Sequence, residues 1–185
     1  MTVTVTPLAI PDVKLVTPRR HGDARGYFVE RWNRQALRDA GIAADFCQDN
    51  HSLSARVGTI RGLHFQAPPF AQAKLVGVLS GRIFDVAVDL RRGSPTFRQH
   101  VAIELDATSD AQLFVPRGFA HGFCTLAPDT LVSYKVDAPY APQADTGVFW
   151  ADPELGIAWP IATGDATLSP KDAVLPPLRN LDNPF

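Results

Sequence analysis

The sequence predicts an all-β protein, a sandwich or barrel of many short strands with only a few short helices. Runs rich in β-branched and aromatic residues recur along the chain roughly 8–12 residues apart, with turn residues between them. The 185 residues include 16 prolines and 13 glycines, which leave little room for long helices. A chain of this length suits one domain with a sizeable core, so we expect residues 1–185 to form a single domain.

Composition argues against several classes of protein. The net charge of -1 gives no bulk attraction to nucleic acid or to an acidic membrane surface. No apolar run approaches the roughly 18 residues of a membrane span, and the first residues lack the pattern of a signal peptide. Cys47 and Cys124 form no CxxC motif, and we expect both to be buried free thiols. The sequence therefore predicts a cytoplasmic protein without nucleic-acid or membrane partners.

The first residues are predicted to form short strands. Residues 2–6 alternate strictly between Thr and Val and form a terminal strand, which needs a sheet to pair with. A second chain could supply that sheet, so this segment suggests strand exchange in a dimer. Residues 14–17 form a strand before Pro18, residues 19–26 a polar turn, and residues 27–32 another strand.

After residue 32 the sequence predicts one helix and then mainly strands. Residues 33–40 form the helix, which Asn33 can cap and Gly41 can end. The strands that follow are expected at residues 45–50, 57–66, 98–104, 112–115, 119–126, 131–136 and 147–150. From about residue 139 the chain is irregular and rich in proline, and we expect this tail to wrap on the surface of the barrel.

The clearest hairpin is predicted between residues 74–80 and 82–90, with Gly81 at the turn. Its second strand, residues 82–90, alternates between two faces with a period of two residues, as a β-strand does. One face of this strand is apolar and carries Phe84, Val86, Val88 and Leu90. The other face is mixed and carries Ile83, Asp85, Ala87 and Asp89.

The segment Arg61-Gly-Leu-His-Phe-Gln66 is predicted to be a strand, but its composition indicates chemistry as well as packing. His64 can act as a general base because histidine titrates near neutral pH; the alternative is a hydrogen-bonded core histidine. In a regular strand, Arg61 faces the side opposite His64. If both serve one site, the strand must bulge at Gly62. Otherwise Arg61 reaches the site from the strand end or from a partner subunit.

A second histidine lies in residues 116–123, where His121 shares one face with aromatic side chains and the other face is nearly without bulk. This pattern fits a strand that lines a cavity, or a packed sheet with an isolated histidine. Metal-binding double-stranded β-helix proteins usually present a His-x-His pair, whereas Phe65-Gln66 follows His64 here. Because local spacing does not supply three ligands, we expect no metal site.

Three cations and two further side chains could complete a site. Arg25, Arg61 and Lys74 could bind a diphosphate, and solvated surface charge is the alternative. The chain has no P-loop and no GxGxxG motif, so side chains would hold any phosphate. Tyr134 is either a buried tyrosine or a proton donor that faces the base across a cavity. Asp172 is either a turn residue or the carboxylate that orients the imidazole.

Several motifs occur in a fixed order from about Leu15 to about Asp172. They are Arg25-Gly-x-Phe-x-Glu30, Gln48-Asp-Asn50, Arg61-Gly-Leu-His-Phe-Gln66, Lys74, Gly81…Asp85-Val-Ala-Val-Asp-Leu-Arg91, Pro116-x-Gly-Phe-Ala-His-Gly-Phe123 and Tyr134-Lys. This ordered set resembles the dTDP-4-dehydrorhamnose 3,5-epimerases, a family of RmlC-type cupins. The resemblance implies a cupin jelly roll (double-stranded β-helix), assembled as a homodimer, without metal or another cofactor. It implies the substrate dTDP-4-dehydro-6-deoxy-D-glucose, epimerised at C3 and C5 to dTDP-4-dehydro-L-rhamnose for dTDP-L-rhamnose synthesis.

The resemblance also implies roles for single residues. His64 is the implied proton acceptor, supported by Asp172, and Tyr134 is the implied proton donor. Positions that match the family's substrate contacts are Arg25, Glu30, Gln48, Asp49, Asn50, Arg61, Lys74, His121, Asp145 and Lys171. At Asp145 the family usually has Glu, so the carboxylate of this chain is one methylene shorter.

The residue chemistry agrees with such an epimerisation. The hydrogens on C3 and C5 lie α to the C4 ketone, so removal of either gives an enolate. His64 and Tyr134 on opposing walls could invert each carbon, and Lys74 could stabilise the enolate oxygen. The alternatives are a mono-epimerase or sugar ketoisomerase on the same scaffold, a non-catalytic cupin that binds sugar nucleotides, and a metal-dependent cupin oxygenase.

Overall fold

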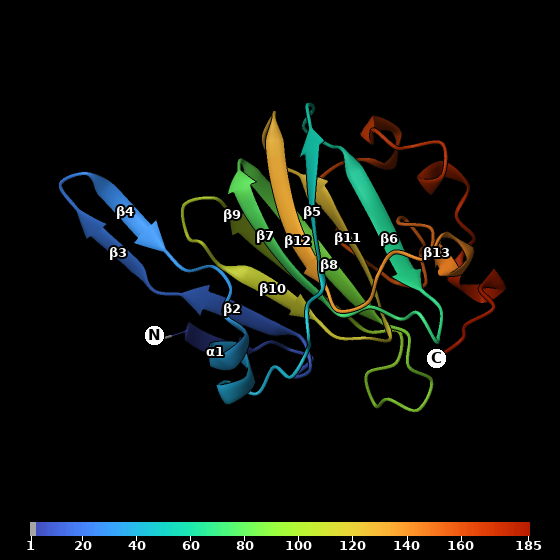
Figure 1. The fold of residues 1–185 in the computed structure, drawn as a ribbon. Coiled ribbons are helices and arrows are strands. Elements are labelled where there is room, and N and C mark those ends of the chain that lie inside the picture. Colours follow the sequence, from blue (N-terminus) through green and yellow to red (C-terminus); the bar gives the residue numbers. More distant parts are fainter. Residues whose placement is uncertain (1–2) are drawn as a thin grey trace.

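Two antiparallel β-sheets face each other in the structure, a computed structural model that describes residues 3–185 (Figure 1). A separate two-stranded hairpin and one short α-helix complete the regular elements at the N-terminal end. This pair of sheets is a cupin jelly roll, so the predicted all-β fold with few helices is confirmed.

The six-stranded sheet has the order β1-β2-β10-β7-β12-β5, and each neighbouring pair is antiparallel. Its strands are β1 (Val3–Pro7), β2 (Lys14–Pro18), β10 (Gln112–Val115), β7 (Lys74–Ser80), β12 (Thr130–Val136) and β5 (Gln48–Ser54). Strand β1 lies at the sheet edge and pairs with β2 of its own chain, so its pairing does not require a second chain. Exchange of this strand in a dimer stays a prediction, and Thr2, where the predicted strand begins, lies outside the described residues.

The five-stranded sheet has the order β13-β6-β11-β8-β9, again with antiparallel neighbours. Its strands are β13 (Asp145–Gly147), β6 (Ile60–Gln66), β11 (Phe119–Thr125), β8 (Arg82–Asp89) and β9 (His100–Asp106). The predicted strands match these within a few residues, and the largest differences are at the strand ends, where pairing stops for reasons outside the local sequence.

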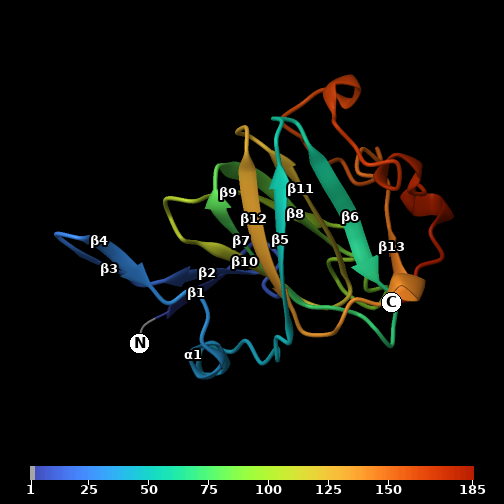
Figure 2. The same cartoon turned by 45° about the horizontal axis from the view of Figure 1, so that its top comes forward.

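The strands β3 (Arg20–Asp23) and β4 (Gly26–Val29) pair only with each other and form a hairpin that we call the arm, residues 20–29. The arm projects away from both sheets in two views (Figures 1 and 2). The prediction of a polar turn over residues 19–26 is therefore wrong. Both faces of β3 are exposed, so the strand lacks the apolar alternation by which a strand is recognised.

The helix α1 (Arg34–Asp39) forms where the sequence predicts it. Asn33 caps the helix, and its side-chain oxygen accepts a hydrogen bond from the backbone N–H of Ala36 at 3.0 Å. Leu37 is buried and packs against residues of β2, β7 and β10. One helix face is thus tied to the six-stranded sheet, close to the base of the arm.

The predicted hairpin of residues 74–80 and 82–90 is wrong as a pairing. The neighbours of β7 are β10 and β12, whereas β8 lies in the other sheet between β11 and β9. Gly81 joins β7 to β8 as the chain crosses from one sheet to the facing one. Two apolar strands joined by a tight glycine turn have the same local sequence pattern in a hairpin as in a crossing between two sheets. Only the packing of the whole chain distinguishes the two arrangements.

Both faces of the five-stranded sheet are covered. On the outer face, Val86 of β8 packs in a cluster with Leu155 and Leu178 of the C-terminal tail. On the inner face, Ala87 packs with the residues between the two sheets. The alternation predicted for β8 is therefore confirmed. The tail contains one short strand and four short 3-10 helices, η1 (Pro142–Ala144), η2 (Thr163–Asp165), η3 (Asp172–Val174) and η4 (Leu178–Asn180).

The two cysteines are free, and Cys124 is buried whereas Cys47 is exposed. The prediction that both are buried is therefore wrong for Cys47, which lies just before β5 at the edge of its sheet. Within residues 3–185, no helix has the length and apolar character needed to cross a membrane. The cytoplasmic location stays a prediction.

Strand β6 is irregular at Gly62, as expected if Arg61 and His64 serve one site. The pairing of β6 with β11 shifts register opposite this glycine, and Gly62 has a φ of 130°. A Cβ atom at Gly62 would lie 2.5 Å from the Cα atom of Gly122 in β11. The irregularity lets Arg61 and His64 line the same cavity, which a regular strand would not allow.

We expect the substitution Gly62→Ala to destabilise the fold strongly. The new methyl group would overlap β11, and an L-residue at this φ is strained, which together cost about 2–5 kcal/mol of unfolding free energy. Denaturant unfolding measures the loss. The matched control is Gly93→Ala, because a Cβ atom there would meet nothing within 4 Å, and its effect should stay below about 1 kcal/mol. Equal losses in the two variants would contradict the close contact at Gly62.

Candidate active site

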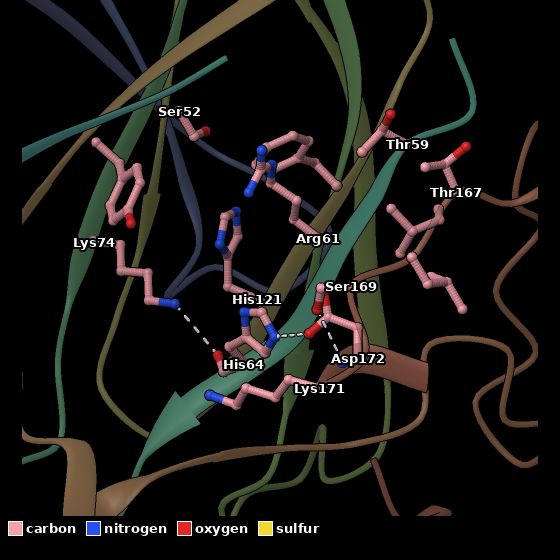
Figure 3. Close-up of a pocket in the computed structure, with 14 residues that line it drawn as sticks. Ser52, Thr59, Arg61, His64, Lys74, His121, Thr167, Ser169, Lys171 and Asp172 are labelled. Atoms are coloured by element: carbon pink, nitrogen blue, oxygen red, sulfur yellow. Dashed lines mark hydrogen bonds and ion pairs between the residues drawn. The ribbon is translucent and has the colours of Figure 1, made fainter. Parts of the chain in front are cut away.

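A cavity of about 350 Å³ lies between the two sheets and is closed on one side by the C-terminal tail (Figure 3). Predicted site residues that line it are Arg61, His64, Lys74, His121, Tyr134, Lys171 and Asp172. They come from β6, β7, β11, β12 and the tail, which are far apart in the sequence. The fold therefore gathers all four predicted catalytic residues in one place.

The central contact of the cavity is between His64 and Asp172, 108 positions further along the chain. The Nε2 atom of His64 lies 2.5 Å from Oδ1 of Asp172. The hydroxyl of Ser169 accepts a hydrogen bond from the backbone N–H of Asp172 at 3.1 Å and holds the turn before η3. Burial opposes ionisation of Asp172, but hydrogen bonds from His64, Ser169 and the backbone of Gly62 lower its pKa overall. Asp172 is therefore an ionised acceptor for the imidazole N–H.

Lys74 is the first residue of β7, and its Nζ atom donates a hydrogen bond to the backbone oxygen of His64 at 3.3 Å. Burial lowers the pKa of Lys74 to about 8, and the carboxylates of Asp145 and Asp85 oppose that shift. An ammonium group has three N–H donors, and this hydrogen bond uses one of them. Lys74 thus presents a cation to the cavity at neutral pH that is easily deprotonated above it.

His121 stands between Lys74 and Arg61 in the cavity (Figure 3). Its Nε2 atom lies 2.7 Å from Oδ1 of Asp85, and both residues are buried. Burial lowers the pKa of His121, although Asp85 acts in the opposite direction. The ring is therefore held neutral by its surroundings and fixed in direction by Asp85.

Arg61 connects the two sheets. Its Nε atom donates to the hydroxyl of Ser54 at 3.1 Å, and its Nη2 atom donates to the backbone oxygen of Leu53 at 2.9 Å. Both partners belong to β5 in the facing sheet. A guanidinium has five N–H donors, so an anchored Arg61 still has donors for an anion in the cavity.

Tyr134 lies on the opposite wall from His64, because β12 belongs to the six-stranded sheet and β6 to the five-stranded sheet. Burial raises the pKa of its phenol. The phenol therefore keeps its proton near neutral pH and can donate it to a group in the cavity.

At the rim of the cavity, Lys171 forms an ion pair with Asp145 of β13. The hydroxyl of Tyr140 also donates to Asp145, at 2.9 Å. Lys171 lines the cavity, whereas Asp145 lies behind it and restrains it. One oxygen of this shorter carboxylate, Oδ2, thus accepts from both neighbours.

Two predicted substrate contacts near the N-terminal end lie outside the cavity of their own chain. Arg25 is at the tip of the arm with its side chain 90% exposed, and it pairs with Asp23 at 2.6 Å. Glu30 follows β4 and accepts a hydrogen bond from Asn33 at 3.2 Å. Its other carboxylate oxygen is buried and has no hydrogen-bond partner among the described residues.

Three further predicted contacts, Gln48, Asp49 and Asn50, lie together on β5 at the sheet edge and outside the cavity. Gln48 donates to the side chain of Asn50 at 2.8 Å, and Asp49 accepts from Lys135 at 2.6 Å. The single chain therefore leaves six of the ten predicted contacts outside its cavity: Arg25, Glu30, Gln48, Asp49, Asn50 and Asp145.

Other residues of the cavity were not named as site residues from the sequence. They are Ser52, Thr59, Ile60, Phe123, Thr167, Leu168 and Ser169, together with Asp85 behind His121. Asp85 carried a usable signal, since a carboxylate on the interior face of a strand needs a buried partner. Between residues 3 and 185, no three His, Cys, Asp or Glu side chains are grouped to hold a metal ion. The expected absence of a metal stays a prediction.

The arrangement has a clear chemical capacity. His64 with its carboxylate partner can take a proton from one side of a bound molecule, and Tyr134 can deliver one from the other side. The cation of Lys74 lies near His64 and can stabilise negative charge that forms on an oxygen. Such a cavity suits proton transfer at a carbon next to a carbonyl group.

Comparison with known proteins identifies the family. Residues 7–180 match the family described as dTDP-4-dehydrorhamnose 3,5-epimerase. A dTDP-4-dehydrorhamnose 3,5-epimerase of Sinorhizobium fredii is 52% identical over 182 residues, which cover 96% of this chain and 91% of that protein.

Solved structures agree with this match. The crystal structure of a dTDP-4-dehydrorhamnose 3,5-epimerase from Bacillus anthracis with TDP and PPi bound has a TM-score of 0.92 at 51% identity, covering 96% of this chain and 100% of that one. A dTDP-6-deoxy-D-glucose-3,5-epimerase from Legionella pneumophila in complex with dTDP-4-keto-L-rhamnose has a TM-score of 0.93 at 40% identity, covering 98% and 95%. The chain therefore belongs to the dTDP-4-dehydrorhamnose 3,5-epimerase family and is an isomerase of that family.

Proposed function

We propose that this chain converts dTDP-4-dehydro-6-deoxy-D-glucose to dTDP-4-dehydro-L-rhamnose by inverting C3 and C5, as a step in dTDP-L-rhamnose synthesis. Family membership supports the type of reaction. One structural observation carries the proposal: the paired His64 and Asp172 belong to one wall of the cavity and Tyr134 to the facing wall. Inversion requires a base and an acid on opposite sides of the carbon, and this cavity has both.

His64 removes the proton in the proposed first step. Its Nε2–H donates to the ionised Asp172, so the lone pair of Nδ1 is free to act as the base. The hydrogens on C3 and C5 lie α to the C4 ketone. When Nδ1 takes either proton, the C–H electron pair moves into an enolate, and Asp172 stabilises the imidazolium that forms.

Lys74 and Tyr134 act in the proposed second step. The ammonium of Lys74 donates to the enolate oxygen, where the negative charge collects. Tyr134 then gives its phenol proton to the opposite face of the same carbon, and the electron pair of the enolate forms the new C–H bond. The phenolate and the imidazolium return to their starting states by proton exchange with water.

We expect the substitution His64→Asn to abolish hydrogen exchange at the reacting carbons. Loss of a general base typically slows the step by about 10²–10⁴. The measurement is NMR of the keto-sugar nucleotide after incubation with purified protein in D₂O. Tyr134→Phe is the matched variant: it keeps the base, so deuterium should still enter at C3 and C5 while inversion is lost.

The fold and dTDP binding of His64→Asn serve as controls, and both should match the unsubstituted protein. Deuterium exchange at the original rate in this variant would contradict the assignment of His64 as the base. With the unsubstituted protein, deuterium at one carbon only would indicate a mono-epimerase, and a ketose product would indicate a ketoisomerase. Binding without exchange would indicate a non-catalytic cupin, and stoichiometric metal in protein purified without added metal would favour an oxygenase.

Activity should fall as the pH rises through about 8, because Lys74 then loses the proton that stabilises the enolate. Its pKa is lowered, so the cation is present below this pH and lost above it. Lys74→Arg keeps a positive charge throughout and should remove the alkaline fall. Lys74→Met should lose about 10²–10³ in rate at neutral pH. The measurement is the initial rate from neutral to alkaline pH, and circular dichroism of each variant controls for loss of the fold. If the rate of Lys74→Arg still falls at alkaline pH, the titrating group is a residue other than Lys74.

We propose further that the protein is a homodimer in which the arm of each subunit reaches the cavity of the other. Arg25 matches a substrate contact of the family, yet it lies far from its own cavity at the tip of the projecting arm (Figure 1). The arm exposes 59% of Tyr27 and 68% of Phe28, aromatic surface that a second subunit would cover. In a twofold dimer the exchange of arms is reciprocal, so both cavities are completed.

Mixed dimers test this exchange. Dimers of the Arg25→Ala variant lack the cation at the tip of the arm, and dimers of the His64→Asn variant lack the base. A mixed dimer joins the intact arm of one variant to the intact base of the other at a single cavity. After dissociation and reassembly of an equal mixture, we expect about one quarter of the original activity.

The unsubstituted protein carried through the same reassembly is the control. If Arg25 served the cavity of its own chain, the mixture would show only the average of the two variants. That result would overturn the exchange of arms and leave the role of His64 untouched.

A further inference from the structure

The direction of the arm is set at its base, because β3 and β4 pair with each other and with no other described strand. Both views show the arm standing clear of the two sheets (Figures 1 and 2). The position of its tip therefore depends on the side chains that hold its two ends to the body of the protein.

One buried carboxylate holds both ends of the arm. Asp110, in the loop between β9 and β10, is 3% exposed and has a left-handed backbone with a φ of 55°. Its Oδ2 atom accepts a hydrogen bond from Nε of Arg20 at 2.5 Å, and its Oδ1 atom accepts one from Nη1 of Arg31 at 3.3 Å. Arg20 begins β3, and Arg31 follows the end of β4. Asp110 thus joins the chain entering the arm to the chain leaving it.

Both arginines are themselves held in place. The guanidinium of Arg20 stacks on the ring of Tyr27 in β4, 3.9 Å from its centroid. The backbone oxygen of Arg31 accepts a hydrogen bond from the side chain of Gln112 in β10 at 2.7 Å. The side chain of Arg31 passes over Gly77 of β7, where a Cβ atom would lie 2.4 Å from Nη2. Continuous contacts therefore run from the six-stranded sheet, through the buried carboxylate, into both strands of the arm.

We infer that Asp110 is a positioning residue for substrate binding, which fixes the arm in the direction that carries Arg25 to the cavity of the partner subunit. The inference rests on the proposed exchange of arms, and it adds a residue that touches no substrate. An arm held in one direction binds without first being ordered. If the arm samples several directions, the apparent affinity for the substrate falls in proportion to the fraction of time that the arm spends in the direction that permits binding. Loss of Asp110 should weaken binding and leave the chemical step at His64 intact.

The test is Asp110→Asn, which keeps the shape of the side chain and removes its charge. If the arm then points correctly about one-tenth of the time, the KM for the keto-sugar nucleotide and the Kd of dTDP rise about tenfold. The kcat stays within about twofold, because the reacting groups are unchanged. Steady-state kinetics and calorimetric titration with dTDP measure the three quantities. The matched control is Asp45→Asn, which removes an exposed ion pair with Arg34 outside the arm and should change none of them.

A double-mutant cycle separates positioning of the arm from a general loss of structure. If Asp110 acts through Arg25, adding Asp110→Asn to Arg25→Ala raises KM no further than Arg25→Ala does alone. Additive effects, or a lower kcat with an unchanged KM, overturn the inference. Arg20→Gln is the second variant if Asp110→Asn folds poorly, because Arg20 is partly exposed and Arg31 still pairs with Asp110. It should raise KM in the same way, and an unchanged KM would count against the inference.

Failure of this inference is distinguishable from failure of the arm exchange. If the mixed dimers regain activity and Asp110→Asn keeps its KM, the exchange stands and the role of Asp110 is overturned. If the mixed dimers stay inactive, the exchange is overturned and the role of Asp110 falls with it.

Discussion

Strands β6 and β11 approach each other so closely at Gly62 and Gly122 that neither position has room for a side chain. A Cβ atom at Gly122 would lie 2.7 Å from the backbone oxygen of Arg61. The irregular pairing that results brings Arg61 and His64 to the same cavity. The backbone of Gly62 also helps to lower the pKa of Asp172. One backbone contact therefore positions an arginine and the candidate base.

The cavity concentrates charge in a place where a protein core is usually apolar. Asp172 and Asp85 are buried, and each is paired with a histidine. Such pairing is required because an unpaired buried carboxylate is strongly destabilising. Lys74 is buried as well, and burial lowers its pKa because no carboxylate among residues 3–185 forms an ion pair with it. Burial disfavours the charged form of either group. It therefore lowers the pKa of Lys74 and raises the pKa of Tyr134.

Local sequence pattern was sufficient for the parts of the fold that local forces decide. The cap at Asn33 and the two faces of β8 depend on neighbours in the chain, and both were predicted. The crossing between the sheets at Gly81 depends on which distant strands pair with β7 and β8, so local pattern does not reveal it. The arm of residues 20–29 was also missed, because β3 is exposed on both faces and lacks an apolar alternation. The cysteine at position 47 was missed for a similar reason, since only the sheet order shows that it precedes an edge strand.

The candidate site divides in the same way. His64 stood out because a strand interior rarely combines arginine, histidine and glutamine, and the need for a bulge at Gly62 followed from the two-residue period alone. Asp172 lies in a tail without any period, so only the ordered motifs of a family connected it to His64. Ser169 could not be predicted, because it is a turn residue that acquires its role only where the tail meets β6.

The position of Asp172 has a consequence for how the protein becomes active during its synthesis. Every strand of the two sheets except β13 precedes the tail in the sequence, and the wall that completes the cavity comes from residues 167–172. The pair of His64 and Asp172 closes a loop of 108 positions, which is among the slower and entropically more demanding events in folding. A nascent chain can therefore pair most of its strands before the tail is made, but it acquires a supported base only after Asp172 has been translated.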